Sequence, residues 1–314
     1  MRCLITGAAG FIGGSLARRL VSNGHDVRGV IHHTQPTFFD KRVEYVSGDI
    51  IDPEFLQSVM DNIDIVYHCA AIVKDYGPKD VFNKINVEGT KNLVAASETS
   101  SVKRFIFLSH IRYESGTNRG YYHETKAKAE HYLLEKFRHD CFPVVIIRPG
   151  NVYGPGATTW VLRPLRAIQK NRIALIDKGT GIFLHTYIDN LLDALELAVQ
   201  APRAVGEIID VTDGENRTTW GVYLNALAQM AGKPPVTRNM SKATGVIVSK
   251  LMMAGYVLFH IEPWVTPVAV KIFSNQNTVS LERAKALLGY EPKVDFAQGM
   301  QHVEQWLKDE RYIP

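Results

Sequence analysis

The chain has 314 residues, of which 46% are hydrophobic and 22% are charged, and its formal net charge is +4. This composition is that of a globular protein, and the length suffices for one large domain or for an ordinary domain and a smaller one. Lysines and arginines are scattered along the chain, whereas a nucleic-acid binder concentrates them on one face. We therefore expect no nucleic-acid partner.

The three cysteines, Cys3, Cys69 and Cys141, lie far apart and lack the spacing of metal ligands. Isolated cysteines are typical of a reducing compartment, so the sequence predicts a cytoplasmic protein without a metal site. The first residues, MRCLITG, do not form an apolar stretch of signal-peptide length.

Short apolar runs alternate with helical patterns through the first half of the chain. Strands are predicted at 2–6, 27–31, 43–46, 63–68, 104–108 and 144–147, and helices from Ile12 to before Asn23, at 81–97 and at 122–137. Strands without polar alternation, separated by helices, are typical of a parallel sheet buried on both faces. The sequence thus predicts an α/β protein with a doubly wound parallel sheet of the Rossmann type.

After Pro149 and Gly150 the alternation loosens. One more strand, at 207–211, is expected to return to the sheet, and the rest is mostly helical up to the amphipathic stretch 296–306. We expect a Rossmann domain of residues 1–155 with about 185–212, and a smaller, mostly helical substrate-binding lobe of about 156–184 with 213–314. The most apolar segment, 244–259, contains Lys250 and is expected to be too short to span a bilayer.

Three glycines, Gly7, Gly10 and Gly13, stand between the first predicted strand and the first predicted helix. The chain must turn tightly there, and bulky side chains would hold a pyrophosphate away from the backbone. The first turn of the helix adds unpaired N–H groups and a partial positive charge. At this place the spacing predicts a bound dinucleotide, although a tight turn without a ligand would need the same glycines.

The second predicted strand ends near Ile31 and is followed by His32 and His33 rather than by an acidic residue. NAD-binding domains commonly place a carboxylate here, about 20 residues after the glycines, to hold the ribose hydroxyls. Without it nothing repels a 2′-phosphate, and the two histidines could donate to one. The sequence therefore favours NADP over NAD; the alternative is that both histidines are solvated loop residues.

Tyr122 and Lys126 are four residues apart in a predicted helix, so their side chains share one face. A phenol has a pKa of about 10 and is a poor acid–base catalyst at neutral pH, but an adjacent ammonium group favours the phenolate. Tyr132 and Lys136 have the same spacing. Only Tyr122 opens the helix near the carboxyl ends of the strands, where such sheets bind ligands, so we predict that Tyr122 and Lys126 are the catalytic pair.

Several motifs in order resemble the extended branch of the short-chain dehydrogenase/reductase superfamily, the NAD-dependent epimerase/dehydratase family. They are TGAAGFIG at 6–13, GDIID at 48–52, HCAA at 68–71, NVEGT at 86–90, YHETK at 122–126, RPGNVYGPG at 148–156, HTYID at 185–189 and ALLGYEPK at 286–293. They run through nearly the whole chain. Within the superfamily, the sequence looks most similar to dihydroflavonol-reductase-like and 3β-hydroxysteroid-dehydrogenase-like members.

The resemblance implies a role for each matching residue. Asp49 and Ile50 would lie by the adenine, Lys126 would bind the nicotinamide ribose, and Asn86 would support the site, or only its own helix. The residues expected at the cofactor are Gly7, Gly10, Phe11, Ile12, Gly13, His32, Asp49, Ile50, Ala70, Ala71, Asn86, Tyr122, Lys126, Pro149 and Val152.

One position departs from the family pattern. The fifth strand of the family ends in a serine or threonine that hydrogen-bonds the substrate oxygen, and here His110 occupies that place, with Ser109 one residue early. A neutral imidazole can donate one hydrogen bond and accept another, so His110 could hold the oxygen. Alternatively a local shift brings Ser109 into place, or the activity is lost and the fold serves as a binding module.

A second departure concerns the substrate. Members that act on nucleotide-sugars usually carry an arginine before the HTYID-like motif, where it grips the diphosphate; here that place is near Phe183. An aromatic ring cannot replace a guanidinium clamp. The apolar stretch 246–259 agrees with a less polar substrate, since it could wall an apolar pocket or touch a membrane surface, but an ordinary buried helix would explain it equally well.

These observations predict an NAD(P)-dependent oxidoreductase that moves a hydride between nicotinamide and an alcohol or ketone carbon of a moderately apolar small molecule. Tyr122 would exchange the proton of the substrate oxygen, and Ser109 or His110 would hold that oxygen. A nucleotide-sugar epimerase or dehydratase with tightly held NAD is the first alternative, and a non-catalytic dinucleotide-binding regulator is the second. By resemblance, a homodimer through helices of the Rossmann domain is expected.

Overall fold

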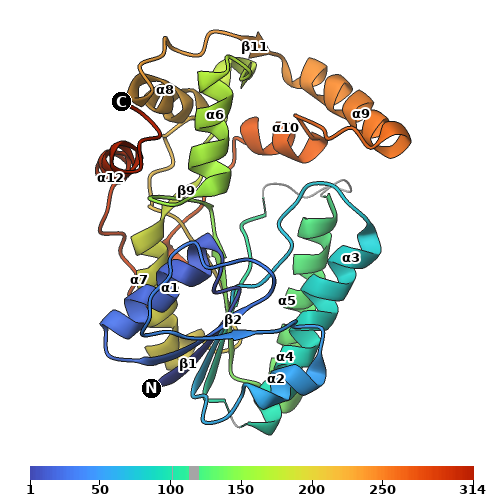
Figure 1. The fold of residues 1–314 in the computed structure, drawn as a ribbon, viewed down its shortest axis with the longest axis vertical. Helices are drawn as coiled ribbons and strands as arrows, with labels where there is room; N and C mark the ends of the chain where they lie inside the picture. The colour runs from blue at the N-terminus through green and yellow to red at the C-terminus, as the bar shows by residue number, and fades with distance from the viewer. Residues whose placement is uncertain (101, 113–119) are drawn as a thin grey trace.

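The structure, a computed structural model, describes residues 1–100, 102–112 and 120–314. Its centre is a seven-stranded parallel sheet with the order β10-β6-β5-β4-β1-β2-β3 (Figure 1). These strands are β1 (Arg2–Thr6), β2 (Asp26–Ile31), β3 (Glu44–Ser47), β4 (Ile65–His68), β5 (Arg104–Leu108), β6 (Val144–Pro149) and β10 (Ile208–Val211). The order reverses between β1 and β4, and sheets of this type bind ligands at the carboxyl ends beside such a reversal.

Helices cover both faces of the sheet (Figure 1). One face carries α1 (Phe11–Ser22) and α7 (Ile188–Gln200), and the other carries α2 (Pro53–Ser58), α3 (Lys79–Asn83), α4 (Gly89–Thr99) and α5 (Gly120–Asp140). In β5, Ile106 and Leu108 pack in the first layer, while Phe105 and Phe107 pack in the second. Because both faces are covered, the strands are apolar at successive positions, as the sequence predicted.

The strand predicted at 104–108 is found at those residues, but the single helix predicted over 81–97 is wrong. α3 ends at Asn83, a π-helical turn runs over Lys84–Glu88, and α4 begins at Gly89. A π-helical turn inserts one extra residue into a helix and locally re-aims the side chains, a distortion that a periodic pattern does not reveal. Asn86 lies in this turn, and its side chain contacts the candidate active site described below.

The remaining helices form a smaller lobe above the carboxyl edge of the sheet (Figure 1). They are α6 (Arg163–Gln169), α8 (Trp220–Met230), α9 (Lys242–Phe259), α10 (Pro267–Phe273) and α12 (Phe296–Asp309). Two short parallel pairs join them, β7 (Asn151–Tyr153) with β9 (His185–Tyr187), and β8 (Leu175–Ile176) with β11 (Asn239–Met240). The helix α11 (Glu282–Leu288) lies instead at the sheet edge, where Arg283 Nε donates to the Ile208 oxygen of β10 at 3.0 Å. The two-domain division by residue number stays a prediction.

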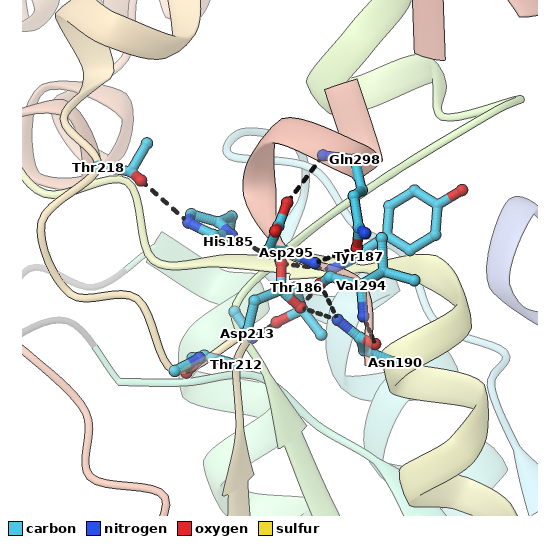
Figure 2. A network of polar contacts seen from close by, with 12 residues as sticks. His185, Thr186, Tyr187, Asn190, Thr212, Asp213, Thr218, Val294, Asp295 and Gln298 are labelled. Carbon is cyan, nitrogen blue, oxygen red and sulfur yellow. Dashed lines mark hydrogen bonds and ion pairs between the residues drawn. The ribbon is translucent and has the colours of Figure 1, made fainter. Parts of the chain in front are cut away.

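A buried carboxylate, Asp213, fastens the lobe to the end of the sheet (Figure 2). Asp213 accepts hydrogen bonds from His185 Nδ1 at 2.6 Å, from the Tyr187 backbone N–H at 2.8 Å and from Asn190 Nδ2 at 2.7 Å. Asn190 also donates to the Val294 oxygen at 2.7 Å. A buried carboxylate is stable only when its acceptor sites are occupied, so this network fixes β9, α7 and the segment leading to α12 relative to one another.

The apolar stretch expected to be too short for a bilayer forms α9, which begins two residues earlier, at Lys242, and has 18 residues. By length and composition alone this helix could cross a membrane, so that expectation was wrong. The alternative of an ordinary buried helix is also wrong, because only 11% of α9 is buried. An apolar sequence looks the same in a core and on a surface, and only the neighbouring elements decide between them.

Candidate active site

The glycine loop has the geometry that a bound pyrophosphate needs. Gly7 has a φ of +73°, and a Cβ atom there would lie 2.8 Å from the Ala70 nitrogen. A Cβ on Gly13 would lie 2.4 Å from the Gly7 oxygen, and one on Gly10 would lie 3.3 Å from that oxygen. Helix α1 starts after Gly10 with no side-chain cap, and Phe11 and Ile12 form its half-buried first turn. The loop therefore leaves N–H groups available and excludes side chains, which fits a dinucleotide phosphate.

At the adenosine end, β2 stops at Ile31 and the exposed His32 follows. The His32 Nε2 atom lies 3.3 Å from Asp49 Oδ2, so the two predicted residues meet. Ile50 is buried beneath α4, where a Cβ on Gly89 would lie 2.7 Å from Ile50 Cδ1. At the predicted adenosine position, Ile50 thus provides an apolar surface, while His32 and Asp49 provide polar groups next to the end of β2.

The segment after β4 is held in place by buried side chains. The Thr6 hydroxyl hydrogen-bonds His68 Nδ1 at 2.7 Å, and its oxygen accepts from the Ala70 N–H at 3.2 Å. On the other side of the ring, His68 Nε2 bonds the Thr90 hydroxyl at 2.9 Å. Burial lowers the pKa of His68 well below 6.5, so the ring is neutral and each nitrogen has its own role. Ala70 and Ala71 are thereby fixed beside the glycine loop.

Asn86 supports this same segment. Its Oδ1 accepts from the Ile72 N–H at 2.8 Å, and its Nδ2 donates to the Thr125 hydroxyl at 3.0 Å and to the Ile72 oxygen at 3.3 Å. The π-helical turn aims Asn86 at both partners. The side chain therefore connects the loop after β4 to the helix that carries Tyr122 and Lys126, which is a positioning role rather than support of its own helix alone.

Lys126 is only 2% exposed, and its Nζ lies 3.8 Å from the centroid of the Phe107 ring. Burial lowers the pKa of Lys126 to about 7, against the opposing Glu130 carboxylate. Tyr122, four residues earlier, is half-buried. Burial and then Glu130 raise the pKa of the Tyr122 phenol above 10, so the expected lowering by the lysine is wrong for the protein without a cofactor. Desolvation is the largest cause of this rise.

Glu130 was not foreseen from the sequence, although the spacing of Tyr122, Lys126 and Glu130 by four residues was a signal for it. Its side chain is 2% exposed and accepts from Arg148 Nε at 2.6 Å, and it also pairs with Arg112. Although burial opposes the effect, the hydrogen bonds from Arg148 and the charges of Arg148 and Arg112 lower the pKa of Glu130.

His110 and Ser109 face different neighbours. The His110 ring lies 5.0 Å from the Tyr122 ring, centroid to centroid, and its Nε2 hydrogen-bonds Nδ1 of His123. Burial, then His123 and Lys126, lower the pKa of His110 well below 6.5. Ser109 is buried beside Glu130 instead, with its backbone N–H bonded to the Ile147 oxygen at 2.8 Å. The Ser109 Oγ atom has no hydrogen-bond partner among the described residues, and of the two side chains only the imidazole of His110 is in ring contact with Tyr122.

The other predicted residues frame these groups. Pro149 ends β6 and its oxygen accepts from the Ile111 N–H at 3.0 Å, and Val152 is buried in β7. The second tyrosine–lysine pair, Tyr132 and Lys136, is engaged elsewhere: Lys136 forms ion pairs with Glu98 and Asp140.

Phe183 occupies the core of the lobe rather than a substrate pocket. It is fully buried, stacks on Tyr223 with ring centroids 4.1 Å apart and lies 4.5 Å from the ring of Trp220. The residue near the expected arginine position is therefore a core phenylalanine.

The family model "NAD dependent epimerase/dehydratase family" matches residues 3–212, which include the glycine loop, Asn86, His110 and the Tyr122–Lys126 pair. The chain belongs to this family. Dependence on NAD as a class of cofactor follows from the family, and the predicted resemblance is confirmed.

Relatives of this family member are dehydrogenases and reductases. A 3-beta-hydroxysteroid dehydrogenase of Mycolicibacterium neoaurum is 29% identical over 95% of this chain and 89% of the relative. A 2-alkyl-3-oxoalkanoate reductase of Shewanella oneidensis is 26% identical over 96% and 84%. These relatives bear out the predicted oxidoreductase class.

Solved structures agree with the fold. A UDP-glucose 4-epimerase of Thermotoga maritima, solved with UDP-glucose, superposes with a TM-score of 0.81 over 99% of this chain and 100% of its own, at 21% identity. The predicted doubly wound α/β fold is therefore confirmed.

The buried Lys126 predicts a pH-dependent stability of the protein without cofactor. Its pKa is about 7 when folded and 10.5 as a free side chain, so the unfolded chain binds more protons between these values. The cost of burying the charge is complete below pH 7 and disappears as the pH rises toward 10.5. Lys126→Met should therefore be more stable than the parent at pH 6.5, and the advantage should shrink on the alkaline side by up to about 1.4 kcal/mol per pH unit.

Urea unfolding followed by circular dichroism at pH 6.5, 8 and 9.5 measures this difference. Lys128→Met, at an exposed position of the same helix, is the control and should show no such trend. A Lys126→Met advantage that stays constant across the pH series would contradict the assigned burial of the charge.

Proposed function

We propose that this chain is an NAD(P)-dependent dehydrogenase or reductase acting on an alcohol or ketone carbon of a moderately apolar substrate. The proposal depends on the contact between the rings of Tyr122 and His110, whose centroids are 5.0 Å apart. This contact lies at the carboxyl edge of the sheet, where the glycine loop also lies. When bound, the nicotinamide supplies or accepts the hydride. The relatives that are dehydrogenases and reductases support the same class.

The chain's own residues would divide the remaining work. Gly7, Gly10 and Gly13 hold the pyrophosphate, and Lys126 holds the ribose next to the reacting ring. Tyr122 exchanges a proton with the substrate oxygen. Because its pKa is raised, the phenol is protonated at neutral pH, which suits donation to a ketone oxygen during reduction.

His110 would hold the substrate oxygen. Its Nδ1 atom is buried and has no hydrogen-bond partner among the described residues, while Nε2 is engaged by His123. A buried polar atom without a partner is costly, and a substrate oxygen would satisfy it. The Ser109 hydroxyl is also buried without a partner among the described residues, so it is the ring contact with Tyr122 that favours His110. The bond to His123 sets the tautomer of His110, and so decides whether Nδ1 donates or accepts.

A moderately apolar substrate is favoured by two features. The position of the diphosphate-binding arginine is taken by Phe183, which is committed to the core. The relatives named for steroid and alkyl-oxoalkanoate substrates act on molecules with extended hydrocarbon parts. A nucleotide-sugar epimerase remains the rival, and it differs by needing no added cofactor for turnover.

NADP is the proposed form of the cofactor. The end of β2 offers exposed His32 and His33 and no carboxylate of its own, which suits a 2′-phosphate. Asp49 opposes this preference, because it lies 3.3 Å from His32. The preference is therefore modest.

We further propose a reducing, cytoplasmic location and a homodimer. The three cysteines are free in the structure, and Cys141 is exposed. Such a thiol is most stable in a reducing compartment. For the dimer, the support is the family resemblance and the partly exposed start of α5, where Tyr121 is 39% exposed.

Tyr122→Phe removes the proton-exchanging oxygen and keeps the ring. Turnover of a ketone panel with added NADPH or NADH should fall by at least about 10³-fold, since acid–base groups contribute up to ~10⁴-fold. Cofactor affinity, measured by nucleotide fluorescence, should stay within about threefold because the phosphate cradle is untouched. Tyr132→Phe is the matched control and should retain parental turnover. Retained activity in Tyr122→Phe would remove the mechanism.

His110→Ala should lower kcat/KM for reduction by about 10²-fold or more, the scale of losing one preorganised hydrogen bond to the reacting oxygen. Ser109→Ala should change it by less than about threefold, because the ring that lies against Tyr122 is that of His110. His110→Ser restores the hydroxyl of the family pattern and should recover part of the loss. Equal losses in both alanine variants would contradict the assignment of the oxygen to His110.

His32→Asp places a carboxylate at the end of β2. It should weaken NADPH binding by about tenfold, through repulsion of the 2′-phosphate, while NADH binding stays equal or improves. Fluorescence titration with both nucleotides measures the change. His139→Asp, exposed at the far end of α5, is the control. If the variant weakens both nucleotides alike, the preference for NADP is not set at His32.

A further inference from the structure

One stretch of the lobe exposes apolar side chains in an unusual concentration. Of the thirteen exposed large hydrophobic side chains among the described residues, seven lie between residues 247 and 264. They make up what we term the α9 face: Ile247, Leu251, Val257, Leu258, Phe259, Ile261 and Trp264, each 60–70% exposed. Monomeric proteins rarely expose contiguous apolar patches without a partner.

The orientation of α9 explains why its apolar side is outermost. Its inner stripe is held by the protein: a Cβ on Gly245 would lie 3.2 Å from Val270 of α10, and the Tyr256 ring lies 4.9 Å from the ring of Tyr76. Ile247 and Leu251 are one helical turn apart on the opposite, outward side. Figure 1 shows α9 at the outer rim of the lobe, away from the sheet.

Charge selects the partner of this face. Within α9 (Lys242–Phe259) the only Lys, Arg, Asp or Glu side chains are Lys242 and Lys250, and both are exposed; the exposed Glu262 follows between Ile261 and Trp264. A second copy docked helix against helix would bring the two lysines of each α9 together, with Glu262 as the one carboxylate of the face to pair with them. At a bilayer, lysine ammonium groups extend to anionic lipid headgroups while their stems stay in apolar surroundings. Trp264 adds an aromatic ring of the kind enriched at the lipid–water boundary.

We propose that the α9 face binds the surface of an anionic lipid bilayer, with α9 lying in the plane of the headgroup–acyl boundary. At ~1.5 Å per residue the helix is about 27 Å long, close to the ~30 Å of a hydrocarbon core. Spanning would nevertheless require α9 to leave its contacts with Val270 and Tyr76. Lying on the surface keeps them.

If the proposed function holds, binding of the α9 face to a bilayer would also bring the enzyme to an apolar substrate dissolved there. Next to the α9–Tyr76 contact, Asp75 Oδ2 accepts a hydrogen bond of 2.6 Å from the Thr266 hydroxyl that caps α10. Asp75 and Tyr76 belong to the loop that follows β4 and Ala70 at the cofactor site. An apolar alcohol or ketone dissolved in the bilayer would thus approach the proposed site along the rim formed by α9 and α10.

Co-sedimentation of the full chain with vesicles tests the binding. Vesicles of phosphatidylcholine mixed with phosphatidylglycerol should retain the protein at least about tenfold better than phosphatidylcholine alone, and added salt should weaken the binding. Leu251→Asp/Leu258→Asp should lose at least about tenfold of the binding, because two apolar contacts are replaced by charges. Val222→Asp, at a 53% exposed position of α8, is the matched control and should bind like the parent.

Circular dichroism and thermal unfolding of the variants show whether they fold. Trp264 fluorescence gives a second readout: the parent should shift to shorter wavelength with vesicles, and Trp264→Phe should lack the shift. Lack of vesicle binding by the folded parent overturns the proposal. So does a dimer in size-exclusion chromatography that only the double Asp variant disrupts, since the face would then join two copies.

Activity separates this proposal from the enzyme assignment. The double Asp variant should turn over a short, water-soluble ketone at the parental rate but lose rate with a substrate delivered in vesicles. If the protein binds vesicles but turns over no substrate, the result supports bilayer binding by the α9 face and refutes the proposed oxidoreductase activity. Equal vesicle-delivered rates in parent and variant would refute entry of the substrate from the bilayer.

Discussion

The candidate active site depends on the buried carboxylate of Glu130. Arg148 of β6 and Arg112 pair with it, and so fix α5 against the ends of the central strands. Removing one partner of a buried ion pair costs about 3–5 kcal/mol, so α5 has little freedom to rotate. Because Tyr122, Lys126 and Glu130 repeat every four residues, fixing the last of them directs the first two toward the cofactor edge.

The same carboxylate sets the electrostatics of the pair it positions. Glu130 adds to the burial that raises the pKa of Tyr122, and it opposes the burial that lowers the pKa of Lys126. The pair therefore consists of a protonated phenol and a lysine that is easily neutralised. Anything that brings positive charge to the nicotinamide position would shift the phenol toward its ionised form, which is a property of the complete site and not of the tyrosine–lysine spacing.

The sequence predicted what local patterns determine. The glycine loop, β5 and the four-residue spacing of Tyr122 and Lys126 follow from chain geometry, and the structure has them where they were expected. The sequence could not decide whether Ser109 or His110 points toward Tyr122. A shift of one residue along a strand turns a side chain to the opposite face of the sheet, and no local rule fixes the backbone after the last paired residue of β5. Glu130 was missed because its partners come from distant segments. The pKa direction of Tyr122 was missed because burial is a property of the assembled fold.

The exposure of α9 was beyond prediction for a related reason, and it bears on how the lobe is built. Phe183, Trp220 and Tyr223 fill the lobe core with aromatic rings without help from the outer side of α9. Folding alone therefore does not account for apolar residues there. The helix is instead tied inward to Tyr76, and α10 is tied to Asp75, both in the loop that continues from the cofactor site. Asn86 joins the start of this same loop, at Ile72, to Thr125 of the helix that carries the catalytic pair. A partner that holds the outer side of α9 would consequently act on a segment that is also bonded to the site.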